Sequence, residues 1–516
     1  MAWLHTWSGL LVGWVLYFIF LTGTIGYFDS EIDRWMRPEL PLVQSTVTQR
    51  EGLDIAFERL ARVAPTASQW TVYPPTGHDV PNINVSWAVP GAGWRNEVLG
   101  PATGEPLEAR ATGGGQALYQ LHYVLRYMPM SVAYWVVGVC SMLMLTALVT
   151  GIITHRRIFR DFFTFRPGRG QRSWLDLHNV FGVFALPFHL MITYSGLVFF
   201  VFTYMSLVVA ATYGGGNEDR NRFFDEALQS PAVPAAAGVE APLATWSGMI
   251  DQAEARWGEG GIRSVDVRHP GDANARVVFT RSHSTPISNG GRIVFDGASG
   301  RMLEHYDTRS GATAVNDALL GLHEGLFAGP ALRWLYFLSG VLGTAMIGSG
   351  LVLWTVKRRA QAPHPGLAIV ERLNVGTIAG LLTAVAAYFW ANRLLPVGLE
   401  ARADAEMDIL FAVWGLLLVH AAFRPRHRAW IEQCVIGAVA FGLLPVVNAL
   451  TSGYGLTASL PAGEWAVAGV DLVCLVLAAC FVVAALRLRR PAPSPAESAP
   501  ALRPGQGRSA DRLTVN

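Results

Sequence analysis

Charged residues and cysteines are both scarce in this chain of 516 residues. Only 15% of the residues are charged, whereas 51% are hydrophobic, and the formal net charge is +2. This composition is typical of an integral membrane protein with some extramembrane mass, and it gives no sign of a nucleic-acid partner. All four cysteines lie inside long apolar stretches, so no structural disulfides are expected in the extramembrane parts: Cys140, Cys434, Cys474 and Cys480.

Nucleotide-binding motifs are absent as well. The sequence has no Gly-x-Gly-x-x-Gly at a strand-to-helix turn and no P-loop, the glycine-rich loops that cradle the phosphates of dinucleotides and ATP. The chain therefore lacks a nicotinamide, flavin or ATP domain of its own. For any redox reaction, its electrons must come from a quinol or from a separate cytoplasmic donor.

Eight stretches are long and apolar enough to cross a lipid bilayer, or nearly so. They are residues 3–27, 131–155, 179–205, 332–356, 374–395, 408–423, 431–451 and 465–486. Lys and Arg gather after the second, fourth, sixth and eighth stretches, and such clusters mark the cytoplasmic side of a membrane. If every stretch crosses, both termini are cytoplasmic. We therefore expect a multi-pass membrane protein.

The predicted fold is a mostly α integral membrane protein with about eight transmembrane helices and two α+β modules on the outer side. The expected division is 1–29 for helix 1, 30–128 for module 1, 129–205 for helices 2 and 3 with a basic cytoplasmic loop, 206–328 for module 2, 329–360 for helix 4, 361–488 for helices 5 to 8, and 489–516 for a disordered cytoplasmic tail.

The two modules repeat one pattern. Residues 51–63 and 244–257 have helical periodicity, and each segment is followed by strand-like alternation. Each module then ends in a hairpin-like turn with a glycine at the same place, Gly104 in one and Gly300 in the other. Glycine there fits a turn position that requires a positive φ.

Six histidines lie at or near the ends of the apolar stretches, and four of them form two matched pairs. Trp3-Leu4-His5-x-x-x-Gly9 recurs as Trp174-x-x-His178-x-x-x-Gly182, and Leu121-His122 recurs as Leu322-His323, each histidine seven residues before a proline. A histidine beside a membrane is costly without a role, and on an apolar helix it is a natural axial ligand for haem iron. The repetition predicts a duplicated scaffold that holds haem. Because no Cys-x-x-Cys-His is present, the haem would be non-covalent b-type.

Equivalent positions in a duplicated scaffold suggest how the ligands pair. His122 and His323 are expected to ligate the iron of an outer haem. His178, with His5 or His155, is expected to ligate the iron of an inner one. If His155 is not a ligand, it could instead hold a propionate.

His189 has no partner in the repeat. It lies eleven residues after His178, which is about 16 Å along a straight helix and about three whole turns. The two histidines are therefore expected on one helix face at two depths. His189 would then ligate a second haem or relay electrons between two haems.

Tryptophans near the ends of the apolar stretches, such as Trp35, Trp334 and Trp465, are expected in the interfacial belt of a membrane protein. Asp471 is the notable charge inside the last four stretches, and a carboxylate at such a position needs a partner or a function.

The sequence resembles the PepSY-associated transmembrane-helix family. The resemblance lies in LHTWSGLLVGW with LTGTIGYFDSEIDRWMRPEL, in TGIITHRRIFRDFFTFRPGRGQRSWLDLHNVFGVFALPFHLMITYSGLVFF, and in LHEGLF with GLVLWTVKRR. It covers about residues 1–360, and the last four stretches fall outside it. The family includes iron-regulated inner-membrane proteins, some similar to siderophore-linked reductases with two b-type haems. The resemblance therefore implies a bacterial inner (plasma) membrane location and two periplasmic PepSY-like modules. It also implies two haems b and a ferric siderophore as substrate.

The expected function is that of an inner-membrane haem reductase in iron uptake. It would pass electrons across the lipid bilayer to a periplasmic ferric siderophore or other ferric chelate. The cofactors carry this chemistry, so no nucleophile or acid–base pair of the protein is required. Two alternatives stay open: a non-enzymatic PepSY-type membrane protein that binds or regulates a periplasmic partner, and a transporter component built on the four extra spans.

Overall fold

The structure is a computed structural model of the chain. It describes residues 1–41, 47–75, 82–154, 158–161, 165–168, 170–227, 230, 233–283, 291–307, 311–359 and 365–489. The predicted ligand His155, parts of the arginine-rich loop after it, and the predicted tail from residue 490 lie outside the described residues.

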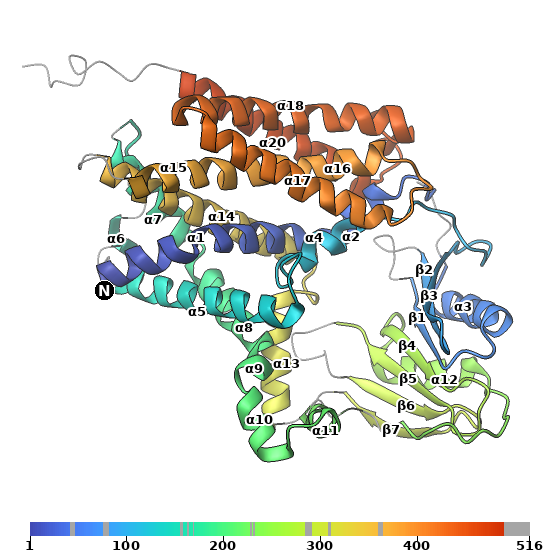
Figure 1. Cartoon of the computed structure of the whole chain (residues 1–516). Coiled ribbons are helices and arrows are strands. Elements are labelled where there is room, and N and C mark those ends of the chain that lie inside the picture. Colours follow the sequence, from blue (N-terminus) through green and yellow to red (C-terminus); the bar gives the residue numbers. More distant parts are fainter. Residues whose placement is uncertain are drawn as a thin grey trace, which may run out of the picture.

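Among the described residues, seven helices are long and apolar enough to cross a membrane, and a bent helix pair makes eight if it counts as one span. The seven are α1 (Ala2–Gly26), α5 (Met130–Thr154), α14 (Pro330–Arg358), α15 (Pro365–Ile378) continued by α16 (Gly380–Leu394), α17 (Arg402–Phe423), α18 (Arg426–Ser452) and α20 (Trp465–Arg489). They form a bundle with residue 1 at one end and a sheet beyond the other (Figure 1). We call these the distal end and the sheet end. The mostly helical multi-span fold is confirmed.

The third predicted span is broken. α7 (Gln171–Phe184) and α8 (Leu186–Phe199) meet at Ala185 with a bend of 68°. Pro187 lies at the start of α8, where it has no amide hydrogen to donate to the preceding turn and its ring obstructs a continuous helix. The expectation of one unbroken span over 179–205 is therefore wrong.

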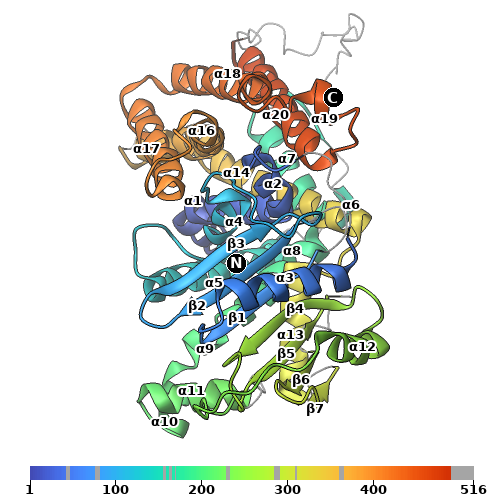
Figure 2. The same ribbon diagram turned by 90° about the vertical axis from the view of Figure 1, so that its right-hand side faces the viewer.

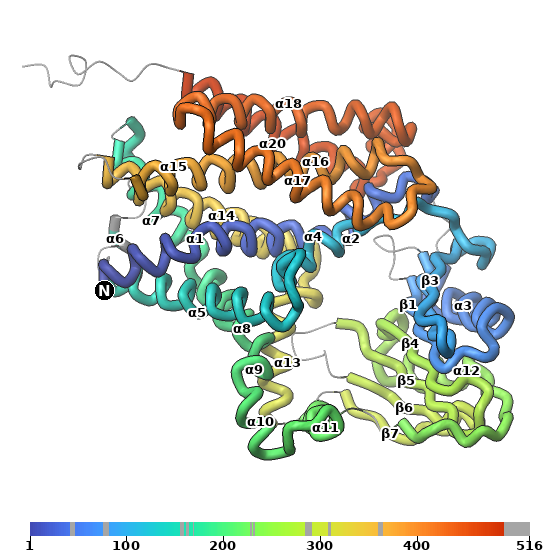
Figure 3. Tube along the Cα trace, in the orientation of Figure 1, coloured from blue at the N-terminus to red at the C-terminus, as the bar shows by residue number. Residues whose placement is uncertain are grey.

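Beyond α8 the chain leaves the bundle and continues toward the sheet, a path that the tube in Figure 3 follows. It passes through α9 (Val201–Tyr204), α10 (Ser206–Tyr213) and α11 (Asn217–Ala227). It returns through α13 (Gly311–Glu324), which packs against α8 before α14 begins. The shorter helices α6 (Ile158–Asp161) and α19 (Leu456–Ser459) lie in connections between spans.

One antiparallel sheet contains all seven strands found in the described part of the chain. They are β1 (Gln69–Tyr73), β2 (Ile83–Val89), β3 (Gly93–Leu99), β4 (Ile262–Arg268), β5 (Arg276–Arg281), β6 (Arg292–Asp296) and β7 (Met302–Tyr306), in the order β3-β2-β1-β4-β5-β6-β7. Strands from the two predicted modules meet at β1 and β4 (Figure 2). Trp70 is opposite Val267 there. The two segments therefore share one continuous sheet.

Two helices cover one face of this sheet. They are α3 (Gln49–Val63) and α12 (Trp246–Trp257), and they coincide with the helices predicted from periodicity. Phe57 of α3 stacks on Trp246, the first residue of α12, with ring centres 3.5 Å apart. Alternate strand residues such as Val265 complete the core, because successive side chains of a strand point to opposite faces.

The two predicted glycine turns are confirmed. Gly104 has a φ of +66° and Gly300 a φ of +69°. Each amide donates to the carbonyl four residues earlier, that of Gly100 in one turn and of Asp296 in the other. A side chain would be strained at both positions.

Two short helices cap the sheet end of α1, namely α2 (Asp29–Met36) and α4 (Gly114–Gln120). Trp35 of α2 is only 1% exposed, and its Nε1 donates to Asp471 of α20 at 2.9 Å. The expected belt position of Trp35 is therefore wrong, because this indole is the buried partner of a carboxylate. Trp334 and Trp465 are 48% and 69% exposed, as belt residues are.

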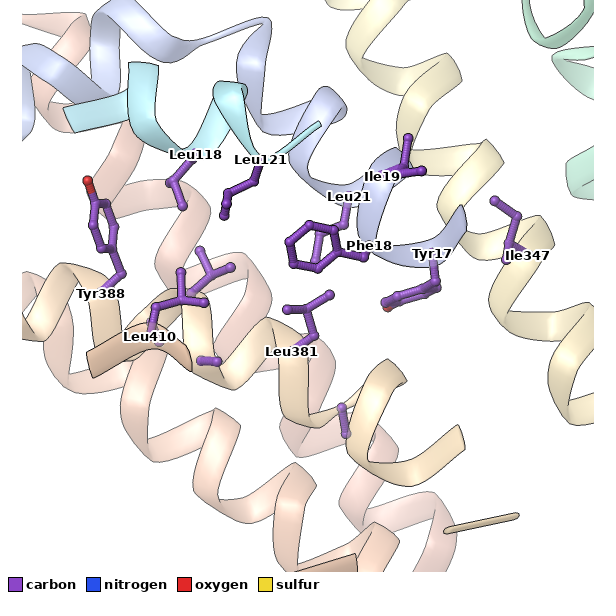
Figure 4. Packing of buried hydrophobic residues seen from close by; sticks show 14 of the residues in the cluster. Tyr17, Phe18, Ile19, Leu21, Leu118, Leu121, Ile347, Leu381, Tyr388 and Leu410 are labelled. Carbon is purple, nitrogen blue, oxygen red and sulfur yellow. The ribbon is translucent and has the colours of Figure 1, made fainter. Parts of the chain in front are cut away.

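The last four spans pack against α1 through a shared apolar core. In Figure 4, Phe18 and Leu21 of α1 lie near Leu381 of α16 and Leu410 of α17. Phe18 also stacks on Trp414 with ring centres 5.5 Å apart. The last four spans and α1 therefore share one packed core.

The strand register makes a direct prediction. Gln69 and Arg268 are Cα partners across β1 and β4, and opposed residues of antiparallel strands lie about 5 Å apart, within reach of a disulfide. In a background without the four native cysteines, the double variant Gln69→Cys/Arg268→Cys should form a disulfide on mild oxidation. Mass spectrometry of the linked peptides would detect it. Gln69→Cys/Ser264→Cys is the out-of-register control, and equal cross-linking of both would contradict the shared sheet.

Candidate functional site

The structure brings the four repeated histidines together as two facing pairs. His122, which follows α4, faces His323 in the last turn of α13 with ring centres 5.9 Å apart. His5 of α1 faces His178 of α7 with ring centres 6.2 Å apart. We call the first the sheet-side pair and the second the distal pair. Both spacings match two imidazoles on opposite sides of one metal ion, since metal–nitrogen bonds of about 2 Å place the ring centres about 6 Å apart.

All four imidazoles use the same nitrogen to contact a neighbouring helix. Nδ1 of His122 lies 2.7 Å from the carbonyl oxygen of Ile19, and Nδ1 of His323 lies 2.8 Å from that of Ile192. It lies 2.8 Å from the carbonyl oxygen of Ala147 in His5, and equally from that of Met346 in His178. A carbonyl only accepts, so each Nδ1 carries a proton, and in the neutral form of each imidazole Nε2 carries the lone pair. This is the tautomer in which metal-bound histidines are usually held.

A glycine lies one turn after each of these carbonyls, against the imidazole. A Cβ at Gly23 would lie 2.5 Å from Nδ1 of His122, and one at Gly196 would lie 2.8 Å from Cε1 of His323. A Cβ at Gly151 or Gly350 would lie 3.1 Å from Cε1 of the facing histidine of the distal pair. Each imidazole therefore occupies a seat made of a helix carbonyl and the glycine four residues later.

The seats follow the internal repeat. One offset of 173 residues relates His5 to His178, Ile19 to Ile192 and Gly23 to Gly196. Another offset, of 199 residues, relates Ala147 to Met346 and Gly151 to Gly350. The sequence-based prediction missed the seat glycines of the sheet-side pair. Their signal was that Gly23 recurs as Gly196 at the offset of 173 residues that also relates His5 to His178.

Cavities adjoin both pairs. Two cavities of about 320 and 300 Å³ share His122 and His323 in their lining, together with Phe20, Tyr119, Ile192 and Glu324. They extend to different sides of the sheet-side pair, toward α5 in one case and toward α14 and Arg263 of β4 in the other. A cavity of about 350 Å³ holds His5 and His178 in its lining. A flat ligand centred between two facing imidazoles requires such space around their axis.

Burial keeps the sheet-side pair neutral. Desolvation lowers the pKa of His122 below its ordinary value. Burial, with His122 nearby, lowers the pKa of His323 to about 3. Neutral imidazole is the form that ligates a metal.

The described residues contain no cluster of three or more His, Cys, Asp or Glu side chains arranged to hold a metal ion. Each pair thus offers two ligands and no more from such residues. A metal held there would need further ligands, and a porphyrin would supply four of them, with the two histidines of a pair as the residues that would hold it. The tautomers, the ring spacings, the seats and the adjoining cavities all fit haem.

His189 belongs to neither pair. The break at Ala185 invalidates the expectation that His178 and His189 share one face of a straight helix. The His189 side chain is fully buried in the lining of a sheet-side cavity, and its Nε2 lies 3.1 Å from the carbonyl oxygen of Ser339. That bond places the proton on the opposite nitrogen from the four paired histidines. Its role as ligand of a second haem or as relay stays a prediction.

Facing histidine pairs in a bundle of seven or eight candidate spans, with an antiparallel sheet beyond one end, define a multi-pass membrane protein with an extramembrane α+β region. The chain belongs to the PepSY-associated TM region family, whose model matches residues 2–357. It is also 27% identical over 373 residues to the uncharacterized protein PA4219 of Pseudomonas aeruginosa. That alignment covers 68% of this chain and 90% of the relative. The family match contains both histidine pairs and the sheet, and it ends before the last four spans.

The seats predict unequal costs for alanine. Gly23→Ala should displace His122 and weaken its bond to Ile19, at about 1–3 kcal/mol for overpacking plus about 1 kcal/mol for the hydrogen bond. A Cβ at Gly415 of α17 meets nothing within 4 Å, so Gly415→Ala is the matched control. Thermal unfolding in detergent should show a lower Tm for Gly23→Ala alone. Equal Tm values for both variants and the parent would contradict the seat.

Proposed function

We propose that the protein is a b-type haem reductase that carries electrons across the membrane to a ferric chelate, such as a ferric siderophore, in the periplasm. The observation that supports it best is the pair of matched sites, each with two facing imidazoles held through Nδ1. Two sites near opposite ends of one bundle suit an electron path across a bilayer. Haem would supply the one-electron chemistry, and the protein's residues hold, space and insulate it.

The proposed orientation places the distal end in the cytoplasm. Basic residues lie at the distal ends of α14, α17 and α20, for example Lys357, Arg424 and Arg487, as the positive-inside rule expects. Electrons from a quinol or a cytoplasmic donor would then enter near the distal pair and leave near the sheet-side pair. A membrane potential negative inside favours that direction by about 2.3 kcal/mol per 100 mV for each electron.

The extramembrane sheet would form part of the exit. Arg263 of β4 lines the same cavity as His122 and His323, so the sheet contacts the sheet-side site directly. A chelate held between this region and the site would receive the electron there. Reduction to Fe(II) weakens binding by hard oxygen ligands, which releases the iron.

The first test is haem binding by matched histidine variants. The purified protein should contain about two haems b per chain by pyridine haemochrome, because each pair of facing histidines would hold one haem. His122→Ala and His323→Ala should remove the same spectral component, and His5→Ala and His178→Ala the other. His420→Ala is the control, since His420 pairs with Glu432. A colourless protein after haem-supplemented expression would favour a binding protein or transporter component instead.

The second test is electron transfer across a membrane. Proteoliposomes loaded with dithionite, with ferric citrate and ferrozine outside, should produce external Fe(II) when the protein is present. Loss of either pair interrupts the path, so His178→Ala and His323→Ala should each reduce the rate at least tenfold, and His420→Ala should not. Haem-loaded protein that produces no external Fe(II) from several ferric chelates would contradict the reductase while leaving haem binding intact.

A further inference from the structure

The cavity of the distal pair has hydrogen-bond donors that nothing in the described structure satisfies. Nε1 of Trp354 and Oγ1 of Thr154 are both buried without a hydrogen-bond partner, and both residues line this cavity. An unsatisfied buried polar group costs about 1–3 kcal/mol. Such groups in a cavity therefore indicate a ligand with acceptor atoms.

Thr154 contrasts with its neighbours on α5. The hydroxyls of Thr146 and Thr150 donate to carbonyls one turn earlier, those of Met142 and Thr146, at 2.9 and 2.6 Å. This local bond is the usual way for a helix to satisfy a threonine hydroxyl. The Thr154 hydroxyl makes no such bond and is left for the cavity.

Positive charge gathers at the same end of the cavity. Lys357 and Arg358 line it, and the Arg358 guanidinium lies 3.8 Å from the ring centre of Trp354. No Asp or Glu is among the described residues that line this cavity. The sheet-side cavity differs, since Asp29 and Glu324 line it beside Arg263. The distal cavity is thus the one with donors and cations but without carboxylates of its own.

We infer that Trp354, Thr154 and Arg358, with Lys357, form a carboxylate-binding site that holds the propionate groups of the distal haem. The inference rests on the proposed haem binding. The indole N–H and the threonine hydroxyl would donate to carboxylate oxygens, and the two cations would neutralise their charge. Charge-assisted bonds of this kind are about twice as strong as neutral ones. Arg358 and Trp354 are therefore positioning residues that also set the potential of the distal haem.

The expected sign follows from charge. A cation near the propionates disfavours the ferric state, which carries one positive charge more than the ferrous state. Removing that cation should therefore stabilise ferric haem. Arg358→Gln should shift the midpoint potential of the distal haem to a lower value. Trp354→Phe keeps the aromatic ring but loses the donor, so it should shift the same potential in the same direction by less.

The test is a spectroelectrochemical redox titration of the purified protein, with the distal component assigned from His178→Ala. Trp7→Phe and Arg359→Gln are matched controls. Trp7 neighbours Trp354 without lining the cavity. Arg359 forms an ion pair with Glu371, and neither residue lines the cavity. Arg358→Lys should retain most of the parent potential. Resonance Raman propionate bands should change in Trp354→Phe and not in Trp7→Phe.

The outcomes separate the two proposals. Lower distal potentials in Arg358→Gln and Trp354→Phe, with the sheet-side potential unchanged, support the site. Two bound haems with unchanged distal potentials and Raman bands in both variants would overturn the carboxylate site and leave haem binding intact. Parent protein without haem would overturn both.

Discussion

The hydrogen bond from a histidine Nδ1 to a helix carbonyl is the constraint on which the arrangement of this protein depends. A helix carbonyl is already the acceptor of an amide four residues later, so an imidazole reaches it only from the side. Glycine at that later position removes the side chain that would block the approach. Glycine inside a helix costs roughly 0.5–1 kcal/mol relative to alanine, and four such positions are kept. The contact between an imidazole and a helix carbonyl, next to a glycine, therefore fixes where neighbouring helices pack against each other.

This constraint also explains how unlike elements supply equivalent histidines. The distal pair comes from α1 and α7, whereas the sheet-side pair comes from α13 and the turn after α4. The seats of the sheet-side pair are on α1 and α8. The break before Pro187 lets one chain segment place His178 on α7 and the seat carbonyl of Ile192 on α8, in directions that differ by 68°. A straight helix would fix both on one axis.

The sequence predicts the spans of this protein, and it also predicts some contacts and turns. Repeated histidines predicted that His122 faces His323, and they left the partner of His178 open between His5 and His155. Gly104 and Gly300 predicted two turns, because duplication and backbone strain both leave marks on single residues. The break at Ala185 was missed because hydropathy continues through it, although Pro187 marked it. The joint sheet was missed because pairing of β1 with β4 depends on residues almost 200 apart. No local pattern records such a contact.

The four C-terminal spans are best understood as support for α1. Trp14 of α1 donates to Asn374 at 3.0 Å, and Tyr17 donates to the carbonyl oxygen of Ile378 at 3.2 Å. At the sheet end, Arg393 bonds to Asn448, and Asn448 donates to Asp471 at 2.9 Å.

Asp471 also accepts from the indole of Trp35, so this carboxylate has buried donors on both α2 and α18. A charge that conducts an ion needs exchangeable partners, whereas these donors are fixed by packing. The network therefore fixes α2, and through it the end of α1 that carries Ile19 and Gly23. On this argument the appended helices hold the register of a helix that bears one paired histidine and one seat, and they need no transport pathway to explain their buried charge.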